Sequence, residues 1–212
     1  MSLSLDARTE VLARVRSALG PEPVVPEVSR GYRTTGDHPP GSPELLELLA
    51  DRLRDYKAGV SSCTADEVTT TVAALLDRLA PGGRLLVPPA LPEGWTSGRD
   101  VLRDDGSTTV DVLDTVAGVL TACSVAVAET GTIVLDAGPD QGRRALSLVP
   151  DLHVCVVRAE QVVHTVPEAL RRLDPRRPQT WISGPSATSD IELNRVEGVH
   201  GPRTLEVVLV VG

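Results

Sequence analysis

The sequence predicts an α/β fold, a three-layer α/β/α sandwich with a mainly parallel sheet. Short valine-rich runs alternate with amphipathic helical segments, as they do in layered α/β domains. Several of these runs are apolar at almost every position, which is typical of strands that are buried on both faces. The chain has 212 residues, enough to bury a sizeable core in one domain with an appendage.

The N-terminal residues are expected to form that appendage. An amphipathic helix is predicted first, ending at Gly20, and its apolar face consists of Leu5, Leu12, Val15 and Leu19. Charged residues interrupt this segment, so we do not expect a signal peptide. The following stretch holds six of the 17 prolines and has no periodicity, which indicates an extended linker. We therefore divide the chain into a helix with linker, residues 1–41, and an α/β domain, residues 42–212.

Two helices are expected at the start of the α/β domain. Ser42 should cap the first helix, which has a proline in its first turn. Thr64 and Glu67 have the spacing of a capping box and should open the second helix, which ends at Pro81. No strand is expected before this second helix, and GRLLVPP, residues 83–89, contains the first predicted strand.

The second half of the chain alternates between the two kinds of element. Strands are expected over residues 124–128, 132–136, 152–158, 180–184 and 204–211. Helical segments are expected near residues 141–149, 166–173 and 189–196. Only a few turn residues separate the first two strands, so we expect a hairpin or a sharp bend at Gly131.

The composition excludes several classes of function. The chain has 29 acidic and 21 basic residues, and its net charge of −8 opposes binding to nucleic acid or to an anionic membrane. Aromatic residues make up 2%, too few for base-stacking platforms. Lys57 is the one lysine, which argues against a phosphate-loop lysine and against Schiff-base chemistry. The longest uncharged run, Thr115 to Ala128, is shorter than the roughly 20 residues of a spanning helix, so no membrane segment is expected.

Cysteine usage indicates a reducing compartment. Cys63, Cys123 and Cys155 are odd in number and widely separated, without a C-x-x-C pair. We therefore expect reduced, buried thiols in a cytoplasmic protein. Three separate cysteines cannot supply the four thiolates of a typical cluster, so neither a metal site nor an iron–sulfur cluster is expected in this chain.

Glu129 is the first candidate for chemistry, because it lies between two apolar runs in AETGTIVLDAG. A carboxylate buried alone is costly unless it finds partners or takes up a proton. Glu129 is therefore either a turn residue that faces water or a side chain with a functional role. We expect it to face a cleft, held by hydrogen bonds from the hydroxyls of Thr130 and Thr132.

A second candidate is the segment SGPSATSDIE, which follows a predicted strand. Ligands of open α/β sheets bind near strand ends, and a helix start favours anions. Ser183, Ser186 and Thr188 would add hydroxyl donors, so the segment is a candidate anion site. The structural alternative is a helix capping box formed by Ser189 and Glu192, which explains these residues without a ligand.

Histidines can act as acids, bases or ligands. His200 lies in GVHGP, a loop stiffened by a proline, where an imidazole can serve any of these roles, although a lone histidine is more often structural. His153 and His164 lie in or beside apolar strand patterns and are expected to be surface or packing residues.

Three motifs, A-E-T-G-T, S-G-P-S-x-T-S-D-I-E and G-V-H-G-P in this order, resemble those of the LUD domain of the lactate utilization protein C family. The resemblance covers roughly residues 45–212. It implies a fold similar to the sugar-phosphate isomerase and coenzyme A transferase group. It also implies a role in oxidising L-lactate to pyruvate beside two partner proteins, at least one of which carries iron–sulfur clusters.

The resemblance also implies a set of site residues, which we interpret as a site for a small anionic ligand. Glu129 and His200 are the candidate catalytic residues. The candidate ligand-binding residues are Thr130, Gly131, Thr132, Ser183, Gly184, Ser186, Thr188, Asp190, Glu192, Gly198 and Gly201.

Two other functions remain open on the sequence. Coenzyme A transferases use a glutamate before a glycine-containing turn as a nucleophile, so Glu129 is a candidate for acyl transfer. The chain is alternatively a non-catalytic module that docks redox partners, which would require an exposed apolar patch.

Overall fold

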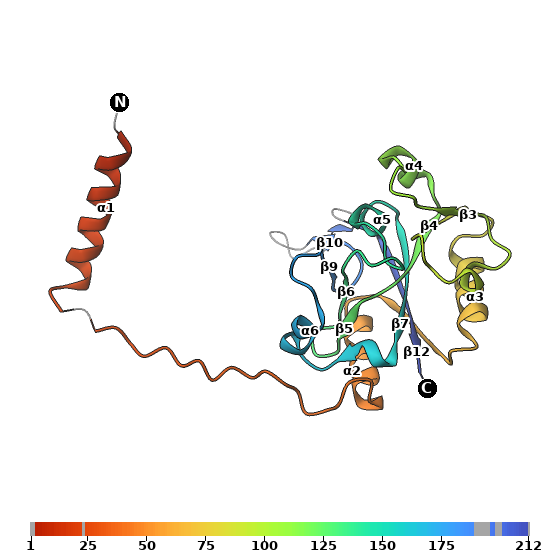
Figure 1. The fold of residues 1–212 in the computed structure, drawn as a ribbon, viewed down its shortest axis with the longest axis horizontal. Helices are drawn as coiled ribbons and strands as arrows, with labels where there is room; N and C mark the ends of the chain where they lie inside the picture. Colours follow the sequence, from red (N-terminus) through yellow and green to blue (C-terminus); the bar gives the residue numbers. More distant parts are fainter. Residues whose placement is uncertain (1–2, 23, 189–195, 198–200, 212) are drawn as a thin grey trace. The chain divides into compact units, whose positions relative to one another are not determined.

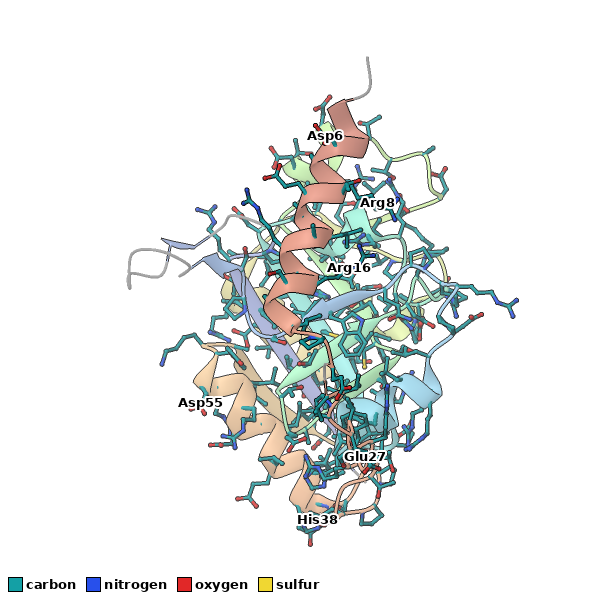
Figure 2. All side chains as sticks on the ribbon, turned by 90° about the vertical axis from the view of Figure 1, so that its left-hand side faces the viewer. Asp6, Arg8, Arg16, Glu27, His38 and Asp55 are labelled. Carbon is teal, nitrogen blue, oxygen red and sulfur yellow. The ribbon has the colours of Figure 1, made fainter. Side chains whose placement is uncertain are left out.

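The structure is a computed structural model, and it describes residues 3–22, 24–188, 196–197 and 201–211. The chain forms two compact units, Met1–Arg33 and Thr34–Gly212. In the first unit, α1 (Leu3–Leu19) is followed by a stretch without helix or strand. Figure 2 shows Asp6, Arg8 and Arg16 projecting from this helix. Its apolar residues are exposed as well, Val11 by 59% and Leu19 by 58%.

The second unit is built on a sheet of six strands, all parallel, in the order β1-β12-β7-β4-β2-β3 (Figure 1). The strands are β1 (Gly59–Cys63), β2 (Leu85–Val87), β3 (Val101–Arg103), β4 (Gly118–Ala122), β7 (Leu152–Arg158) and β12 (Thr204–Val210). Helices flank the sheet, so the predicted α/β fold with a mainly parallel sheet is confirmed.

Alternate residues of each central strand face opposite layers, because successive side chains of a strand point to opposite sides. The helices that cover the two faces are α2 (Pro43–Asp55) and α3 (Val68–Leu79). In β7, Val154 and Val156 pack with α3, whereas Cys155 and Val157 pack with α2, and all four are fully buried. Burying an aliphatic side chain of this size contributes about 1.5–3 kcal/mol, so the central strands supply much of the stability.

A smaller sheet of four strands, in the order β8-β5-β6-β9, packs beside α2. Its strands are β5 (Val125–Val127), β6 (Thr132–Leu135), β8 (Val162–Val163) and β9 (Thr180–Ile182). Inner residues such as Ile133 share the core of α2, and outer residues such as Val134 pack with the residues of α6 (Val166–Arg172). β5 and β6 are antiparallel, and Gly131 has a φ of 60° in the turn between them, which confirms the predicted hairpin.

The remaining elements are short. They are η1 (Glu93–Thr96), α4 (Val110–Thr115), α5 (Arg144–Leu148), η2 (Ala159–Gln161), β10 (Ala187–Thr188) and β11 (Val196–Glu197). β10 and β11 pair in an antiparallel manner. Val196 therefore lies in a strand and not in the helix predicted near 189–196, while residues 189–195 lie outside the described residues.

The expectation of no strand before α3 is wrong, because β1 precedes this helix. Among the described strands, β1 pairs with β12 alone and is an edge strand, so the polar sequence GVSSC is tolerated in it. Ser42 caps α2 as predicted, with Oγ accepting from the amide of Leu45 at 3.4 Å. The amide of Thr64 donates to Glu67 Oε2 at 3.0 Å, but α3 begins only at Val68, so this contact closes the turn that precedes the helix.

No helix in the described part of the chain combines the length and the apolar character that crossing a membrane requires.

A buried ion pair joins the end of β3 to the start of α5. Asp104 is 4% exposed, and both of its carboxylate oxygens accept hydrogen bonds from Arg143, from Nε and from Nη2, at 3.1 Å each. Burial by itself would raise the pKa of Asp104, but the hydrogen bonds from Arg143 and Thr108 outweigh it and hold this pKa below its usual value. The folded state therefore favours the ionised carboxylate.

We expect Asp104→Asn to lower the free energy of unfolding by about 2 kcal/mol at pH 7, because the substitution leaves the guanidinium of Arg143 without its charged partner. A lowered pKa in the folded state gives stability that is present above the ordinary aspartate pKa of about 4 and is lost as the pH falls through the folded value. The difference between the wild-type protein and the variant should therefore shrink below about pH 4. Urea titrations at pH 7 and pH 3 would measure it.

Asp114 is exposed and provides the matched control. Asp114→Asn should change the unfolding free energy by less than about 0.5 kcal/mol at either pH. An Asp104→Asn effect that is equal at both pH values would show that the charge of Asp104 does not stabilise the fold.

Candidate functional site

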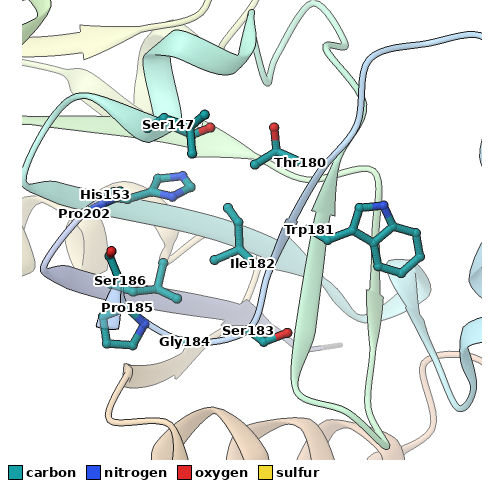
Figure 3. A pocket seen from close by; sticks show the side chains of 13 residues that line it. Ser147, His153, Thr180, Trp181, Ile182, Ser183, Gly184, Pro185, Ser186 and Pro202 are labelled. Carbon is teal, nitrogen blue, oxygen red and sulfur yellow. The ribbon is translucent and has the colours of Figure 1, made fainter. Parts of the chain in front are cut away.

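A cavity of about 220 Å³ lies where the amino ends of β7 and β12 meet β9 and the loop that follows it (Figure 3). Its wall is formed by Ser147, Leu148, His153, Thr180, Trp181, Ile182, Ser183, Gly184, Pro185, Ser186, Gly201, Pro202 and Leu205. Figure 3 shows Thr180 and Ile182 near His153, with the indole of Trp181 farther away. None of these described lining residues carries a carboxylate, ammonium or guanidinium group.

Two loops that are distant in the sequence form one side of the cavity. The amide of Ser186, in the loop after β9, donates to the carbonyl of Pro202, in the loop before β12, at 2.8 Å. This bond holds the SGPS segment against the beginning of a central strand. The segment thus follows the carboxyl end of β9 but lies at the amino ends of the parallel strands β7 and β12.

Hydroxyl groups connect the ETGT turn to this loop. Thr130 Oγ1 and Thr132 Oγ1 are 2.8 Å apart, and Thr132 Oγ1 is also 2.8 Å from Ser183 Oγ. β6 and β9 are antiparallel neighbours, which places the beginning of β6 beside the end of β9. Two of the three sequence motifs therefore meet through side-chain hydrogen bonds at the cavity wall.

Both turns rest on the last turn of α2 and the residue that caps it. A Cβ on Gly131 would lie 2.7 Å from Cβ of Arg52, and a Cβ on Gly184 would lie 2.5 Å from Cβ of Tyr56. The two glycines also have positive φ, 60° and 82°, which other residues rarely adopt. Glycine is therefore required at both positions for two reasons. Each residue has a positive φ, and each approaches α2 or its capping residue too closely to leave room for a Cβ.

The predicted site residues fall into three groups. Ser183, Gly184, Ser186 and Gly201 line the cavity, and Thr132 with Thr130 joins it through the hydroxyl chain. Glu129 and Gly131 lie in the β5–β6 turn, and Thr188 lies in β10. Asp190, Glu192, Gly198 and His200 lie outside the described residues.

Glu129 is exposed and does not line this cavity, and the expectation that it faces a cleft stays a prediction. Its amide donates to the carbonyl of His164 at 3.1 Å, which ties the β5–β6 turn to the end of β8. Because Glu129 is exposed, its carboxylate does not carry the cost of burial in the core.

His153 is a cavity residue that sequence reasoning missed. It is 1% exposed, and its Nε2 lies 2.8 Å from Thr121 Oγ1 of β4. No described residue lies within hydrogen-bonding reach of the other ring nitrogen, Nδ1, although this atom is buried. A buried polar atom without a partner is uncommon and calls for an explanation. The available signal was a single polar residue in LHVCVVR, an otherwise apolar strand up to its last residue.

Behind His153, a chain of polar atoms runs into the core. Thr121 Oγ1 lies 3.8 Å from Cys155 Sγ, and Cys155 Sγ lies 3.8 Å from the carbonyl oxygen of Ala122. A hydrogen bond to Cys155, together with burial, raises the pKa of the neighbouring Cys123 thiol well above its usual range. Cys123 is therefore a protonated thiol at neutral pH.

Among the described residues, no three His, Cys, Asp or Glu side chains gather closely enough to hold a metal ion. The cysteines Cys63, Cys123 and Cys155 are all buried, with at most 6% exposure.

The family model described as the LUD domain matches residues 42–210, which include every described element of the cavity. The chain belongs to the LUD domain family. A curated member of similar sequence, Lactate utilization protein C of Deinococcus radiodurans, is 46% identical over 198 residues, covering 91% of this chain and 86% of that protein. A protein of the same name from an Exiguobacterium species is 27% identical over 96% of this chain and 95% of its own length.

This chain is also similar to a solved structure, a DUF162 family protein from Deinococcus radiodurans. The two share 42% identity with a TM-score of 0.67, over 79% of this chain and 96% of the other. The likeness in sequence and in fold therefore extends over the α/β domain that contains the cavity.

We expect Gly131→Ala to lower the unfolding free energy by about 2–4 kcal/mol, because the added methyl group meets both a positive φ and the Arg52 Cβ. Gly82 isolates the first effect, since its φ is 67° and a Cβ added there would have no atom within 4 Å. Gly82→Ala should cost only about 1 kcal/mol. Urea denaturation of both variants gives the comparison, and equal losses would mean that contact with α2 does not constrain the turn.

Proposed function

We propose that this chain takes part in lactate utilization as a component of a cytoplasmic system that oxidises L-lactate to pyruvate, and that it binds a small carboxylate in the cavity beside β9. Support for the role comes from the relatives named Lactate utilization protein C, one of them 46% identical over most of both chains. Support for the location comes from the geometry of the cavity.

The observation that carries the assignment of the site is the contact between two family motifs at one cavity wall. Thr132 of ETGT and Ser183 of SGPS share a hydrogen bond of 2.8 Å, and residues Ser183 to Ser186 line the cavity itself. Motif residues that served folding alone would not need to converge on an open volume. A cavity of about 220 Å³ is ample for a three-carbon acid, and its apolar residues Ile182 and Leu205 can contact a methyl group.

The hydroxyl groups supply the chemistry that a carboxylate needs in an uncharged cavity. A serine or threonine hydroxyl donates one hydrogen bond and accepts others, and hydrogen bonds to a charged group are stronger than those between neutral groups. A small acid bound in this way keeps its charge without an ion pair. Its affinity is then modest, because no described lining residue offers a full positive charge.

The redox chemistry is assigned to iron–sulfur partner proteins rather than to this chain. A typical cluster takes four thiolates, whereas this chain has three cysteines, all buried in its core. The acyl-transfer alternative gains no support from the cavity, because exposed Glu129 does not line it.

We expect L-lactate to shift the amide resonances of Ser183, Gly184 and Ser186 in the purified chain. Ser183→Ala should raise the Kd about threefold to tenfold, because one neutral hydrogen bond is lost. Amide chemical-shift titration measures both effects, and the exposed Ser97 provides a control variant, Ser97→Ala, that should leave the Kd unchanged. Stationary signals at these three residues while others move would place the ligand elsewhere.

Growth on lactate tests the biological role. Glu129→Gln preserves the shape of an exposed motif residue and removes its charge, so we expect a folded protein that supports slower growth. Complementation of a lactate-utilization deletion strain is the assay, with a melting curve for each variant. The matched control is Glu160→Gln, at another exposed acid. Loss of growth with both variants, or with neither, would remove Glu129 from the function.

A further inference from the structure

The unpartnered nitrogen of His153 gives the cavity a chemical preference. The imidazole forms part of the wall and is 1% exposed, so its polar atoms must be satisfied inside the protein or by a ligand. Nε2 has a partner, Thr121 Oγ1 at 2.8 Å, whereas no described residue offers one to Nδ1. Nδ1 is therefore the ring atom whose hydrogen-bonding capacity the described residues leave unused.

The direction of the hydrogen bonds behind the ring fixes its tautomer. The carbonyl oxygen of Ala122 can only accept, so the Cys155 thiol donates to it. The lone pairs of Cys155 then accept from the Thr121 hydroxyl, and the Thr121 oxygen in turn accepts from His153. Hydrogen bonds from Cys123, His153 and Thr121 lower the pKa of Cys155 to about 5, and a thiolate at this position still accepts from the Thr121 hydroxyl, so the order at Thr121 is the same. His153 thus carries its proton on Nε2, and Nδ1 presents a lone pair.

We propose that His153 makes this cavity selective for a small carboxylate that carries a hydroxyl group over the corresponding oxo acid, an inference that rests on the proposed carboxylate-binding function. A ligand hydroxyl donates to Nδ1, whereas an oxo group has no hydrogen to donate and leaves the buried nitrogen unpaired. Thr121 is a positioning residue, because it acts only through the imidazole and does not line the cavity.

The environment of the ring supports a neutral acceptor. The side chains that share the cavity wall with it are hydroxyl, apolar or aromatic, and no charged group occurs among the described lining residues. Of the nearest hydroxyls, Ser147 Oγ donates to the carbonyl of Arg144 at 3.3 Å and so is already engaged. Selection therefore depends on the pattern of donors and acceptors and not on charge.

The tautomer can be tested without any ligand. Long-range ¹H–¹⁵N correlation spectra of ¹⁵N-histidine-labelled protein should show His153 protonated at Nε2 and bare at Nδ1. Thr121→Val removes the acceptor while keeping the shape of the side chain, and the spectrum should then lose this single-tautomer signature. A wild-type His153 that is protonated at Nδ1 would overturn the inference, whatever the cavity binds.

The selectivity is tested with three acids that differ only at the second carbon: L-lactate, pyruvate and propionate. The wild-type chain should bind L-lactate about tenfold more tightly than either of the others, because only lactate satisfies Nδ1. His153→Leu should bring the three Kd values together, and Thr121→Val should do so without altering the cavity wall. His38→Leu, at an exposed histidine outside the cavity, is the matched control and should keep the preference.

The outcomes separate the two proposals. Equal binding of L-lactate and pyruvate by the wild-type chain would overturn the role of His153 and leave carboxylate binding in place. Binding of none of the three acids would overturn both. If His153→Leu does not fold, Thr121→Val and the tautomer spectrum decide, and a lactate preference that survives in Thr121→Val would contradict the inference.

Discussion

The close packing of two turns on the end of α2 is the constraint on which the candidate site depends. Gly131 and Gly184 come from distant parts of the sequence, yet both approach this helix to within a distance that excludes a Cβ. Their shared support brings the hydroxyls of Thr132 and Ser183 within 2.8 Å. The helix itself is fixed by three leucines that are 0% exposed and pack against the central strands. The geometry of a polar site is thus set by apolar packing one layer away.

The cavity combines an uncharged described lining with a chain whose net charge is −8. The overall field of such a protein repels anions at long range, so electrostatic steering cannot bring an acid to this site. Recognition then has to act at contact distance, through directional hydrogen bonds and the fit of a small apolar group. Sites of this kind distinguish ligands by the pattern of donors and acceptors and do not need high affinity.

The extent to which the sequence predicted this structure varied with the element. The segment predicted as a strand over 152–158 is β7, Leu152–Arg158, because a nearly continuous apolar run is typical of a buried parallel strand. β1 was missed, since an edge strand with one protected side tolerates serines that break the pattern. Ser183 and Ser186 were predicted as site residues and line the cavity, but β10, which directly follows them at Ala187–Thr188, was not predicted. His153 was missed because only the pairing of β4 with β7 reveals Thr121 as its partner.

The position of β12 between β1 and β7 has a consequence for how the protein is made. β1 is synthesised early, at residues 59–63, but its only partner among the described strands is β12, residues 204–210. On the ribosome, the nascent chain must therefore hold β1 and one edge of β7 unpaired until the last described strand emerges. Parallel strands so far apart in sequence pair slowly, and exposed apolar edges of this kind invite contact with other chains. Folding of the main sheet therefore waits for the synthesis of β12, and during that wait chaperones have reason to bind.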